Sequence, residues 1–332
     1  RNATGVVRYA RGDVARGFQE AEVVLEETFR TARVYQGYLE PHATVAVPDL
    51  VRSGVTIYTA TQGIFYVRAQ VCDLLGLPEQ QVRVVPMAIG GGFGSKILFT
   101  QGLTAALALA VRRPVRLVLP RRDDFLVANV APAAAITVRI GARRDGTLLA
   151  LQARLVFDCG AEPGSTAAIA GTLLGGYYKV PHLLVEGFDG MTHLPPVGAY
   201  RAPGAPQATF AIEGMMDRLA RRLGRDPIDL RLQNASAEGD PQPSGRPWPR
   251  IGLRQVLEKV REHPIWRDRR PGNGVGVAVG GWTGGVESAS ACVRANTDGT
   301  FQVVVGAVDL TGTFTSMAQI AAEVLGVPVE RV

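Results

Sequence analysis

The hydrophobic positions of this chain recur with two periods, one typical of strands and one typical of helices. Stretches that alternate apolar and polar residues, or are rich in β-branched residues, predict strands. These stretches are 22–31, 43–47, 55–60, 82–89, 116–119, 135–139, 148–156, 186–194, 276–280, 288–295 and 301–308, and another begins near 327. Apolar residues spaced three and four apart predict helices at 13–20, 64–75, 97–111, 207–223, 228–234, 251–263 and 314–325. The pattern predicts an α+β fold, with mixed sheets and packed helices.

One segment interrupts this pattern and marks the best candidate for a domain boundary. Residues 239–250 are too rich in proline and polar residues for regular structure. A length of 332 residues also predicts about two domains. We therefore expect a first domain at 1–238, a linker at 239–250 and the beginning of a second domain at 251–332. Because a hairpin and one helix are all that this second domain shows of its core, we expect it to be incomplete.

The glycine loop, Gly90–Lys96, joins the predicted strand at 82–89 to the predicted helix at 97–111. Its sequence is GGGFGSK. Glycine permits positive φ and close approach, so this order of elements can present backbone N–H groups and a helix N-terminus to an anion. The loop predicts a phosphate or cofactor site. A glycine-rich turn without a ligand remains an alternative.

Two familiar phosphate-binding motifs do not fit this loop. A nucleotide P-loop requires Gly-Lys followed by Ser or Thr, whereas Ser95 precedes Lys96 and Ile97 follows it. A dinucleotide motif requires G-x-G-x-x-G, which no spacing of these glycines supplies. A generic phosphate-binding module remains open as an unrelated alternative.

Polar side chains also lie where predicted elements turn. Gln62 follows the strand at 55–60, and a neutral amide there can donate and accept hydrogen bonds, which suits an oxo group or an uncharged substrate. Arg201 precedes the helix at 207–223 and can clamp a phosphate or a pterin edge, although a solvated surface arginine is the alternative. The Glu40-Pro41-His42 segment indicates a turn more readily than a site.

Composition and charge narrow the class of protein. Hydrophobic residues make up 46% and charged residues 20%, as in ordinary globular proteins. No apolar run reaches the roughly 18 residues of a membrane span. The net charge of +6 is spread along the chain without a nucleic-acid recognition motif. Cys72, Cys159 and Cys292 are too far apart for a zinc or iron–sulfur motif. We expect a cytoplasmic protein that binds no nucleic acid, membrane or protein-ligated metal.

Several spaced segments together resemble the molybdenum-binding subunits of the xanthine dehydrogenase and aldehyde oxidase family, the molybdenum hydroxylases. The glycine loop is similar to the GGGFGGK loop of that family. The other similar segments occur in the family's order and lie at 38–42, 61–62, 200–204, 207–210 and 223–231. The resemblance covers essentially the whole chain and implies the molybdopterin-binding fold of that family.

The resemblance also implies a cofactor, which is molybdenum held by molybdopterin, expected in its cytosine dinucleotide form. It assigns Gln62 to an oxo ligand and Arg201 to the pterin side. The other cofactor-binding positions that it implies are Gly91, Gly92, Phe93, Gly94, Ala202, Thr311 and Gly312. The implied reaction is hydroxylation of an electrophilic carbon, with electrons leaving through iron–sulfur clusters and FAD on partner subunits or domains.

Departures from the family pattern narrow the substrate. Purine-oxidising members carry a Glu directly after the loop lysine, where this chain has Ile97. Ile97, Glu40 and Pro203 form the predicted substrate pocket, and the apolar Ile97 favours an aldehyde or an N-heteroaromatic compound over a purine. Members that oxidise carbon monoxide carry a Cys at the position of Ala202. Thr311 replaces a Gln that contacts the cofactor in the family.

The family's general-base glutamate belongs to a segment beyond Val332, so the catalytic residue is unknown. We therefore expect a fragment of a molybdenum hydroxylase large subunit that is inactive alone. It would need the remaining C-terminal part of that subunit and the iron–sulfur and flavin partners, and a dimer is a possible assembly. The alternative is a non-catalytic half of a split subunit, or a cofactor-handling or scaffold protein.

Overall fold

The chain forms two compact units, each assembled from separate stretches of sequence. The structure is a computed structural model that describes residues 2–97, 100–270, 272, 274–282 and 288–332. Unit 1 comprises Arg1–Val34, Ala131–Val197 and Ala202–Thr283. Unit 2 comprises Tyr35–Val130, Gly198–Arg201 and Gly284–Val332. The chain passes between the two units several times, so neither is a single continuous segment.

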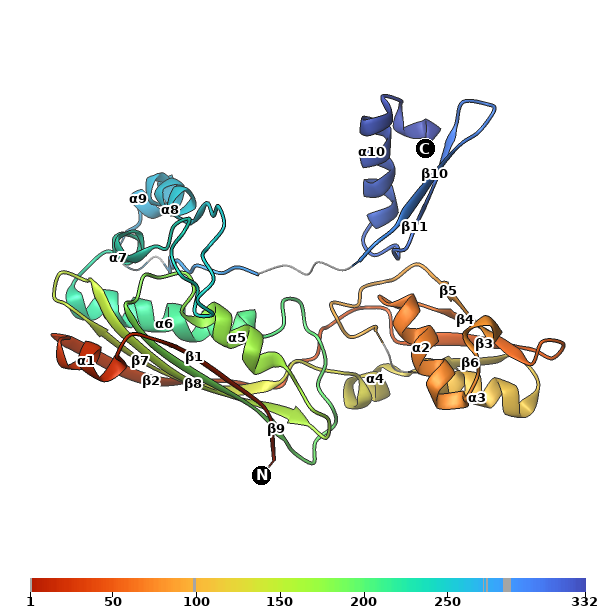
Figure 1. The fold of residues 1–332 in the computed structure, drawn as a ribbon, viewed down its shortest axis with the longest axis horizontal. Helices are drawn as coiled ribbons and strands as arrows, with labels where there is room; N and C mark the ends of the chain where they lie inside the picture. Colours follow the sequence, from red (N-terminus) through yellow and green to blue (C-terminus); the bar gives the residue numbers. More distant parts are fainter. Residues whose placement is uncertain (1, 98–99, 271, 273, 283–287) are drawn as a thin grey trace. The chain divides into compact units, whose positions relative to one another are not determined.

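Unit 1 is built on a five-stranded sheet with the order β1-β9-β8-β7-β2 (Figure 1). Its strands are β1 (Ala3–Arg11), β2 (Val23–Thr31), β7 (Ala133–Ala142), β8 (Leu148–Gly160) and β9 (His182–Met191). Only β8 and β9 run parallel, and the other neighbours pair antiparallel. The helices of unit 1 are α1 (Val14–Gln19), α5 (Thr166–Leu174), α6 (Ala205–Leu223), α7 (Pro227–Asn234), α8 (Leu253–Glu262) and α9 (Pro264–Arg267).

The core of unit 1 lies between its sheet and helices α5 and α6. α5 contacts β1, β8 and β9, and α6 contacts β2 and β7. Along α6, Ile212, Met215 and Leu219 are buried at helical spacing, so one face of this helix covers the sheet. Gly224 ends α6 in a left-handed conformation, and the Asp226 side chain caps α7.

Unit 2 contains a four-stranded sheet with the order β5-β4-β3-β6 (Figure 1). Its strands are β3 (Ala43–Asp49), β4 (Gly54–Thr59), β5 (Val82–Pro86) and β6 (Val115–Val118). Helices α2 (Ile64–Leu75) and α3 (Gln101–Val111) pack against this sheet and against each other, and α4 (Arg121–Val127) follows β6. Buried Ile57, Val67, Val71 and Ala105 form the centre of this core.

The C-terminal stretch of unit 2 is a hairpin followed by a helix. β10 (Ala291–Ala295) and β11 (Phe301–Val305) pair antiparallel, and α10 (Thr313–Leu325) and a short 3₁₀ helix (Val329–Arg331) follow. Every residue of β10 is exposed. Large apolar side chains are also exposed along α10, namely Phe314, Met317, Ile320 and Val324. A two-stranded hairpin has little stability of its own, so this stretch leaves much apolar surface uncovered.

The α+β fold class and most predicted elements are confirmed, and α2 begins and ends where the helical spacing predicts. Residues 162–178, rich in small residues, contain the close-packed helix α5. The predicted helix start at Ile97 includes residues 98–99, which lie outside the described residues, and α3 begins at Gln101. In the described part of the chain, no helix is both long and apolar enough to cross a membrane.

Two predicted strands are wrong, and the pattern missed β1. β1 is a strand because it pairs with β9 far along the chain. Residues 276–280 are extended but are not in a sheet, since no described strand pairs with them. The strand expected near Val327 is instead the 3₁₀ helix at Val329–Arg331.

Candidate functional site

The glycine loop follows β5 in unit 2, and three of its residues have a left-handed backbone conformation. Gly91, Phe93 and Gly94 have φ angles of +89°, +52° and +104°. A Cβ on Gly92 would lie 2.4 Å from Gln62 Oε1, and a Cβ on Gly94 would lie 2.4 Å from the Ala199 carbonyl oxygen. The clash at Gly94 is with backbone, so glycine is required there, whereas the clash at Gly92 is with the end of a side chain that can move. These two glycines let Gln62 and Ala199 pack directly against the loop.

Both the side chain and the backbone of Gln62 form hydrogen bonds with this loop. Its side-chain Oε1 accepts a hydrogen bond from Gly94 N–H at 2.9 Å, and its backbone N–H donates to the Lys96 carbonyl at 2.6 Å. Because a backbone N–H can only donate, the amide atom facing Gly94 is the oxygen. The Nε2 group of Gln62 then remains as a hydrogen-bond donor. A half-buried amide donor beside the glycine loop suits an oxo or carbonyl group.

The turn Gly198–Arg201 packs on the same loop within unit 2. The Arg201 N–H donates to the Phe93 carbonyl at 3.0 Å, while the Arg201 side chain is exposed. Gln36 supports this turn, because its Nε2 donates to the Ala199 carbonyl at 2.8 Å. Gln36 Oε1 is buried and has no hydrogen-bond partner among the described residues. The sequence analysis did not single out Gln36, because a lone glutamine in an irregular segment carries no pattern.

The segment around Thr311 also reaches the loop in unit 2. An isolated parallel bridge pairs Leu310 with Ile89, the residue before the glycine loop. Thr311 and Gly312 follow with φ angles of +56° and +83°. Ala202 and Pro203 belong to unit 1, where they precede α6.

Strained backbone coincides with the predicted cofactor positions. Five non-glycine residues of the described chain have positive φ angles, and three of them are Phe93, Ala202 and Thr311. Such conformations cost on the order of 1–3 kcal/mol each and persist where the surroundings enforce them, commonly at ligand sites. The other two are Ser53 in a turn and Arg112 at the end of α3. In unit 2, Phe93 and Thr311 therefore have the strained backbone that is common at ligand sites.

A buried polar cluster centred on Asp124 of α4 supports the loop. Asp124 is fully buried, and its Oδ1 lies 2.7 Å from His42 Nδ1 and accepts from Tyr38 OH at 3.2 Å. Its Oδ2 accepts from Tyr35 OH and from Arg121 at 3.0 Å. Burial alone would raise the pKa of Asp124, but the hydrogen bonds from Tyr35 and His42 outweigh it and hold that pKa below its ordinary value.

The cluster reaches the loop through two hydroxyl groups. Tyr38 OH lies 3.4 Å from Ser95 Oγ, and Ser95 Oγ donates to the Asn129 carbonyl at 3.2 Å. His42, which the sequence assigned to a turn, is thus part of the buried support of the loop. α4 was not predicted from the apolar pattern, so nothing in the sequence pointed to Asp124.

Asp124→Asn is expected to lower the stability of unit 2 by about 3 kcal/mol, because it leaves buried donors without their carboxylate. The sign of the pH dependence follows from the lowered pKa. A carboxyl group with a folded-state pKa below the ordinary 3.8 stabilises the fold above that pH. This stabilisation is lost as the pH falls through the folded-state pKa. In urea unfolding, the free energy of unfolding of the wild type should fall between pH 7 and pH 3. It should fall less in Asp124→Asn.

The predicted pocket residues Glu40 and Ile97 also meet the loop. Glu40 Oε2 accepts from Gly90 N–H at 2.7 Å and from Lys96 Nζ at 2.5 Å. The Ile97 carbonyl accepts from Thr61 Oγ1 at 2.9 Å, which holds Ile97 beside the Gln62 segment. Unit 2 thus brings together, at one loop, Gln62, Gly91, Gly92, Phe93, Gly94, Arg201, Thr311, Gly312, Glu40 and Ile97.

Two family models match this chain. Both carry the description molybdopterin cofactor-binding domain, and they match residues 1–235 and 250–332. Among curated relatives, the large molybdopterin subunit of nicotinate dehydrogenase from Eubacterium barkeri is 34% identical, over 76% of this chain and 61% of its own length. The xanthine dehydrogenase molybdenum-binding subunit of Escherichia coli O157:H7 is 34% identical, over 97% of this chain and 45% of its own length.

Solved structures also resemble this fold. Quinoline 2-oxidoreductase from Pseudomonas putida 86 superposes with a TM-score of 0.90 at 27% identity, over 100% of this chain and 47% of that chain. The chain thus spans roughly half the length of the proteins that it matches. With both family models and relatives of this identity in agreement, the chain belongs to the molybdopterin cofactor-binding family of the xanthine dehydrogenase and aldehyde oxidoreductase molybdenum-binding subunits.

Proposed function

We propose that this chain is the cofactor-binding part of a molybdenum hydroxylase large subunit that oxidatively hydroxylates an aldehyde or an N-heteroaromatic compound. The observation that carries the proposal is the geometry at Gly94. Its N–H fixes the Gln62 amide, and its missing side chain lets the Ala199 backbone pack directly against the loop. This arrangement holds a neutral hydrogen-bond donor, Gln62 Nε2, beside the loop without a charged group.

The residues present fit a molybdopterin. Gly91, Gly92, Phe93 and Gly94 would approach it through the backbone of the loop, whose close packing against Gln62 and Ala199 depends on Gly92 and Gly94. Gln62 would donate from Nε2 to an oxo ligand, and Arg201, Ala202, Thr311 and Gly312 would hold the pterin. When bound, the cofactor, in its cytosine dinucleotide form, supplies the oxidation of the substrate carbon. The buried cluster around Asp124 keeps the loop in place beneath it.

The substrate class rests on the predicted pocket residues Ile97, Glu40 and Pro203. Ile97 has an apolar side chain, which offers no hydrogen bond to the polar edge of a purine. The Glu40 carboxylate is already engaged by Gly90 and Lys96. Two of the relatives are named for nicotinate and quinoline, which are N-heteroaromatic compounds other than purines, and one is named for xanthine, a purine. Ile97 therefore carries the preference for an aldehyde or N-heteroaromatic substrate over a purine.

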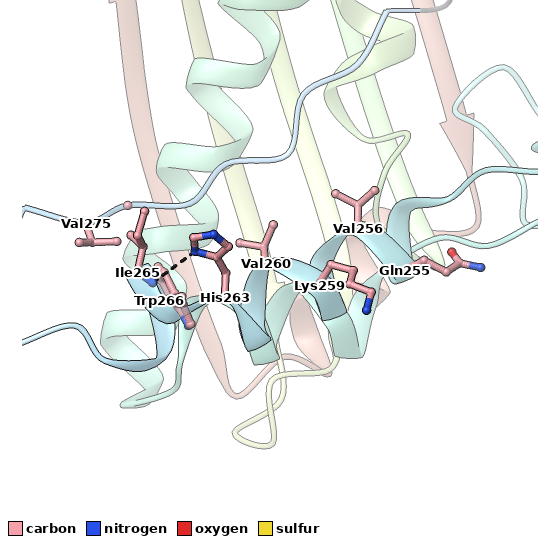
Figure 2. A pocket seen from close by; sticks show the side chains of 9 residues that line it. Gln255, Val256, Lys259, Val260, His263, Ile265, Trp266 and Val275 are labelled. Atoms are coloured by element: carbon pink, nitrogen blue, oxygen red, sulfur yellow. Dashed lines mark hydrogen bonds between the residues drawn. The ribbon is translucent and has the colours of Figure 1, made fainter.

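An uncovered groove in unit 1 supports the remaining C-terminal part of the large subunit as a partner. The groove, of about 560 Å³, lies between α8 and α9 and the extended segment with Val275 (Figure 2). Val256 and Val260 project from one side of α8 into it, and Val256 and Ile265 are 60% and 65% exposed. Apolar grooves of this kind are normally covered by protein. The relatives are about twice as long as this chain, which supports further sequence of the same subunit as the cover.

The wider assembly is part of the same proposal. The two family models, at 1–235 and 250–332, support a first domain at 1–238, a linker at 239–250 and a second, incomplete domain at 251–332. The general base would come from the remaining part of the subunit. Iron–sulfur and flavin partners would accept the electrons, and the location would be cytoplasmic. The isolated chain would then bind cofactor poorly or show no turnover.

The test is cofactor analysis of the chain purified from a host that makes molybdopterin, with and without a coexpressed C-terminal part of the large subunit. We expect stoichiometric molybdenum and a released pterin nucleotide in the joined protein, and dye-linked oxidation of an aldehyde or quinoline but not of xanthine. Turnover by the 332-residue chain alone would contradict the incomplete site. Stable pairing without molybdenum or pterin would favour the non-catalytic scaffold instead.

A further inference from the structure

We propose that Lys96 and Glu40 form a clamp that closes the glycine loop and thereby positions the Gln62 amide. In this role Lys96 and Glu40 are positioning residues, and neither needs to touch the substrate. The inference deepens the proposed function and rests on it, because the loop is the proposed cofactor cradle. All residues of the clamp lie in unit 2.

Lys96 is a buried cation with a specific anionic partner. Its side chain is fully buried, and its Nζ lies 2.5 Å from Glu40 Oε2. The same Nζ lies 4.8 Å from the centre of the Tyr38 ring, which adds a cation–π contact. Burial lowers the pKa of Lys96, and the Glu40 carboxylate opposes that shift. A buried charge is costly without its partner, so removing Glu40 alone would leave Lys96 as an uncompensated buried cation.

The same carboxylate joins the two ends of the loop. Glu40 Oε2 accepts from both Gly90 N–H and Lys96 Nζ, the first and last residues of the loop. A Cβ on Gly90 would lie 2.6 Å from the Glu40 Cβ, so the approach depends on glycine at that position. The loop is thus tied end to end through one oxygen atom. The Glu40 side chain is 35% exposed, whereas that of Lys96 is fully buried.

The clamp acts on Gln62 through the backbone of Lys96. The Lys96 carbonyl accepts from Gln62 N–H at 2.6 Å and from Thr61 Oγ1 at 3.2 Å. The Gln62 side chain in turn accepts from Gly94 N–H, inside the loop. Any displacement of Lys96 therefore moves the backbone of Gln62 and changes where its Nε2 points. Loss of the clamp should loosen the loop before it unfolds the sheet.

The test uses Lys96→Met, Glu40→Gln and the double variant, each made in the full chain with any subunits that copurify. Lys96→Met keeps the apolar stem and leaves Glu40 partly solvated, so we expect hydrogen exchange in the peptide spanning 88–97 to accelerate ~10-fold while β3 and β4 stay protected. Glu40→Gln leaves Lys96 buried without an anion and should accelerate it more. The double variant should recover part of that protection, since the unpaired cation is gone.

A second readout separates positioning from packing. Molybdenum and released pterin should fall ~10-fold in Lys96→Met with little change in Tm, because binding is weakened by opening of the loop. If Lys96 only fills space, the effects of Lys96→Met and Glu40→Gln on hydrogen exchange will be additive. Exchange will then rise in β4 and α3 as much as in residues 88–97. Exchange in 88–97 within twofold of the wild type would also overturn the clamp. A wild type that binds no pterin would instead defeat the proposed function, and exchange would still report on the clamp.

Discussion

Gly94→Ala is expected to cost the protein its bound molybdopterin while the core of unit 2 stays folded. The added Cβ would meet the Ala199 carbonyl oxygen at 2.4 Å, and its backbone would have to hold φ at +104°. Relieving this contact requires the loop or the Gly198–Arg201 turn to move. That movement breaks either the Gly94–Gln62 or the Arg201–Phe93 hydrogen bond. A strain of roughly 1–3 kcal/mol then disfavours the closed loop.

The measurement is molybdenum and pterin per chain, compared with thermal unfolding of the same samples. We expect cofactor content to fall ~10-fold, which corresponds to about 1.4 kcal/mol and lies within that range of strain. Gly76→Ala is the matched control, because Gly76 also has a positive φ, at +63°, but no atom lies within 4 Å of its added Cβ. This control should lose some stability and keep its cofactor. Equal cofactor loss in both variants would mean that backbone strain alone, and not the loop contact, is responsible.

Local pattern was enough to predict the elements that carry the loop. The spacing of Ile64, Val67 and Val71 placed α2 correctly, and two of these residues, Val67 and Val71, are buried in the core of unit 2, a requirement that a short window of sequence expresses. The glycines similarly predicted a bare loop, since positive φ at Gly91 and Gly94 has a direct sequence signature. The α+β fold class followed from such local signals.

The support beneath the loop could not be predicted, because it is made of distant residues. His42 and Asp124 are 82 positions apart, and α4, which carries Asp124, lacks a clear apolar period. Lys96 gave no hint of burial, since a lysine after a glycine loop is usually solvated. β1 likewise depends on its pairing with β9. Sequence indicated which residues could face a cofactor, and only the fold shows what holds them.

Gln62→Glu is expected to abolish turnover of the assembled enzyme while leaving its cofactor content close to that of the wild type. A glutamate keeps an oxygen that can accept from Gly94 N–H, so the loop should stay closed. It loses the Nε2 donor, however, and an ionised carboxylate can only accept. Removing one such donor from a site that stabilises developing charge lowers kcat by about 100-fold or more. The added negative charge beside an oxo group should deepen the loss.

Gln62→Ala is the matched comparison, since it removes the acceptor and the donor together. This variant should lose both turnover and cofactor, because Gly94 N–H is left without its partner and the loop can open. Steady-state kcat and pterin content, measured on the same preparations, separate the two roles of Gln62. If Gln62→Glu retained more than about a tenth of wild-type kcat, the donor role of Nε2 would be wrong. If Gln62→Ala retained full cofactor, the link between the Gln62 oxygen and loop closure would be wrong instead.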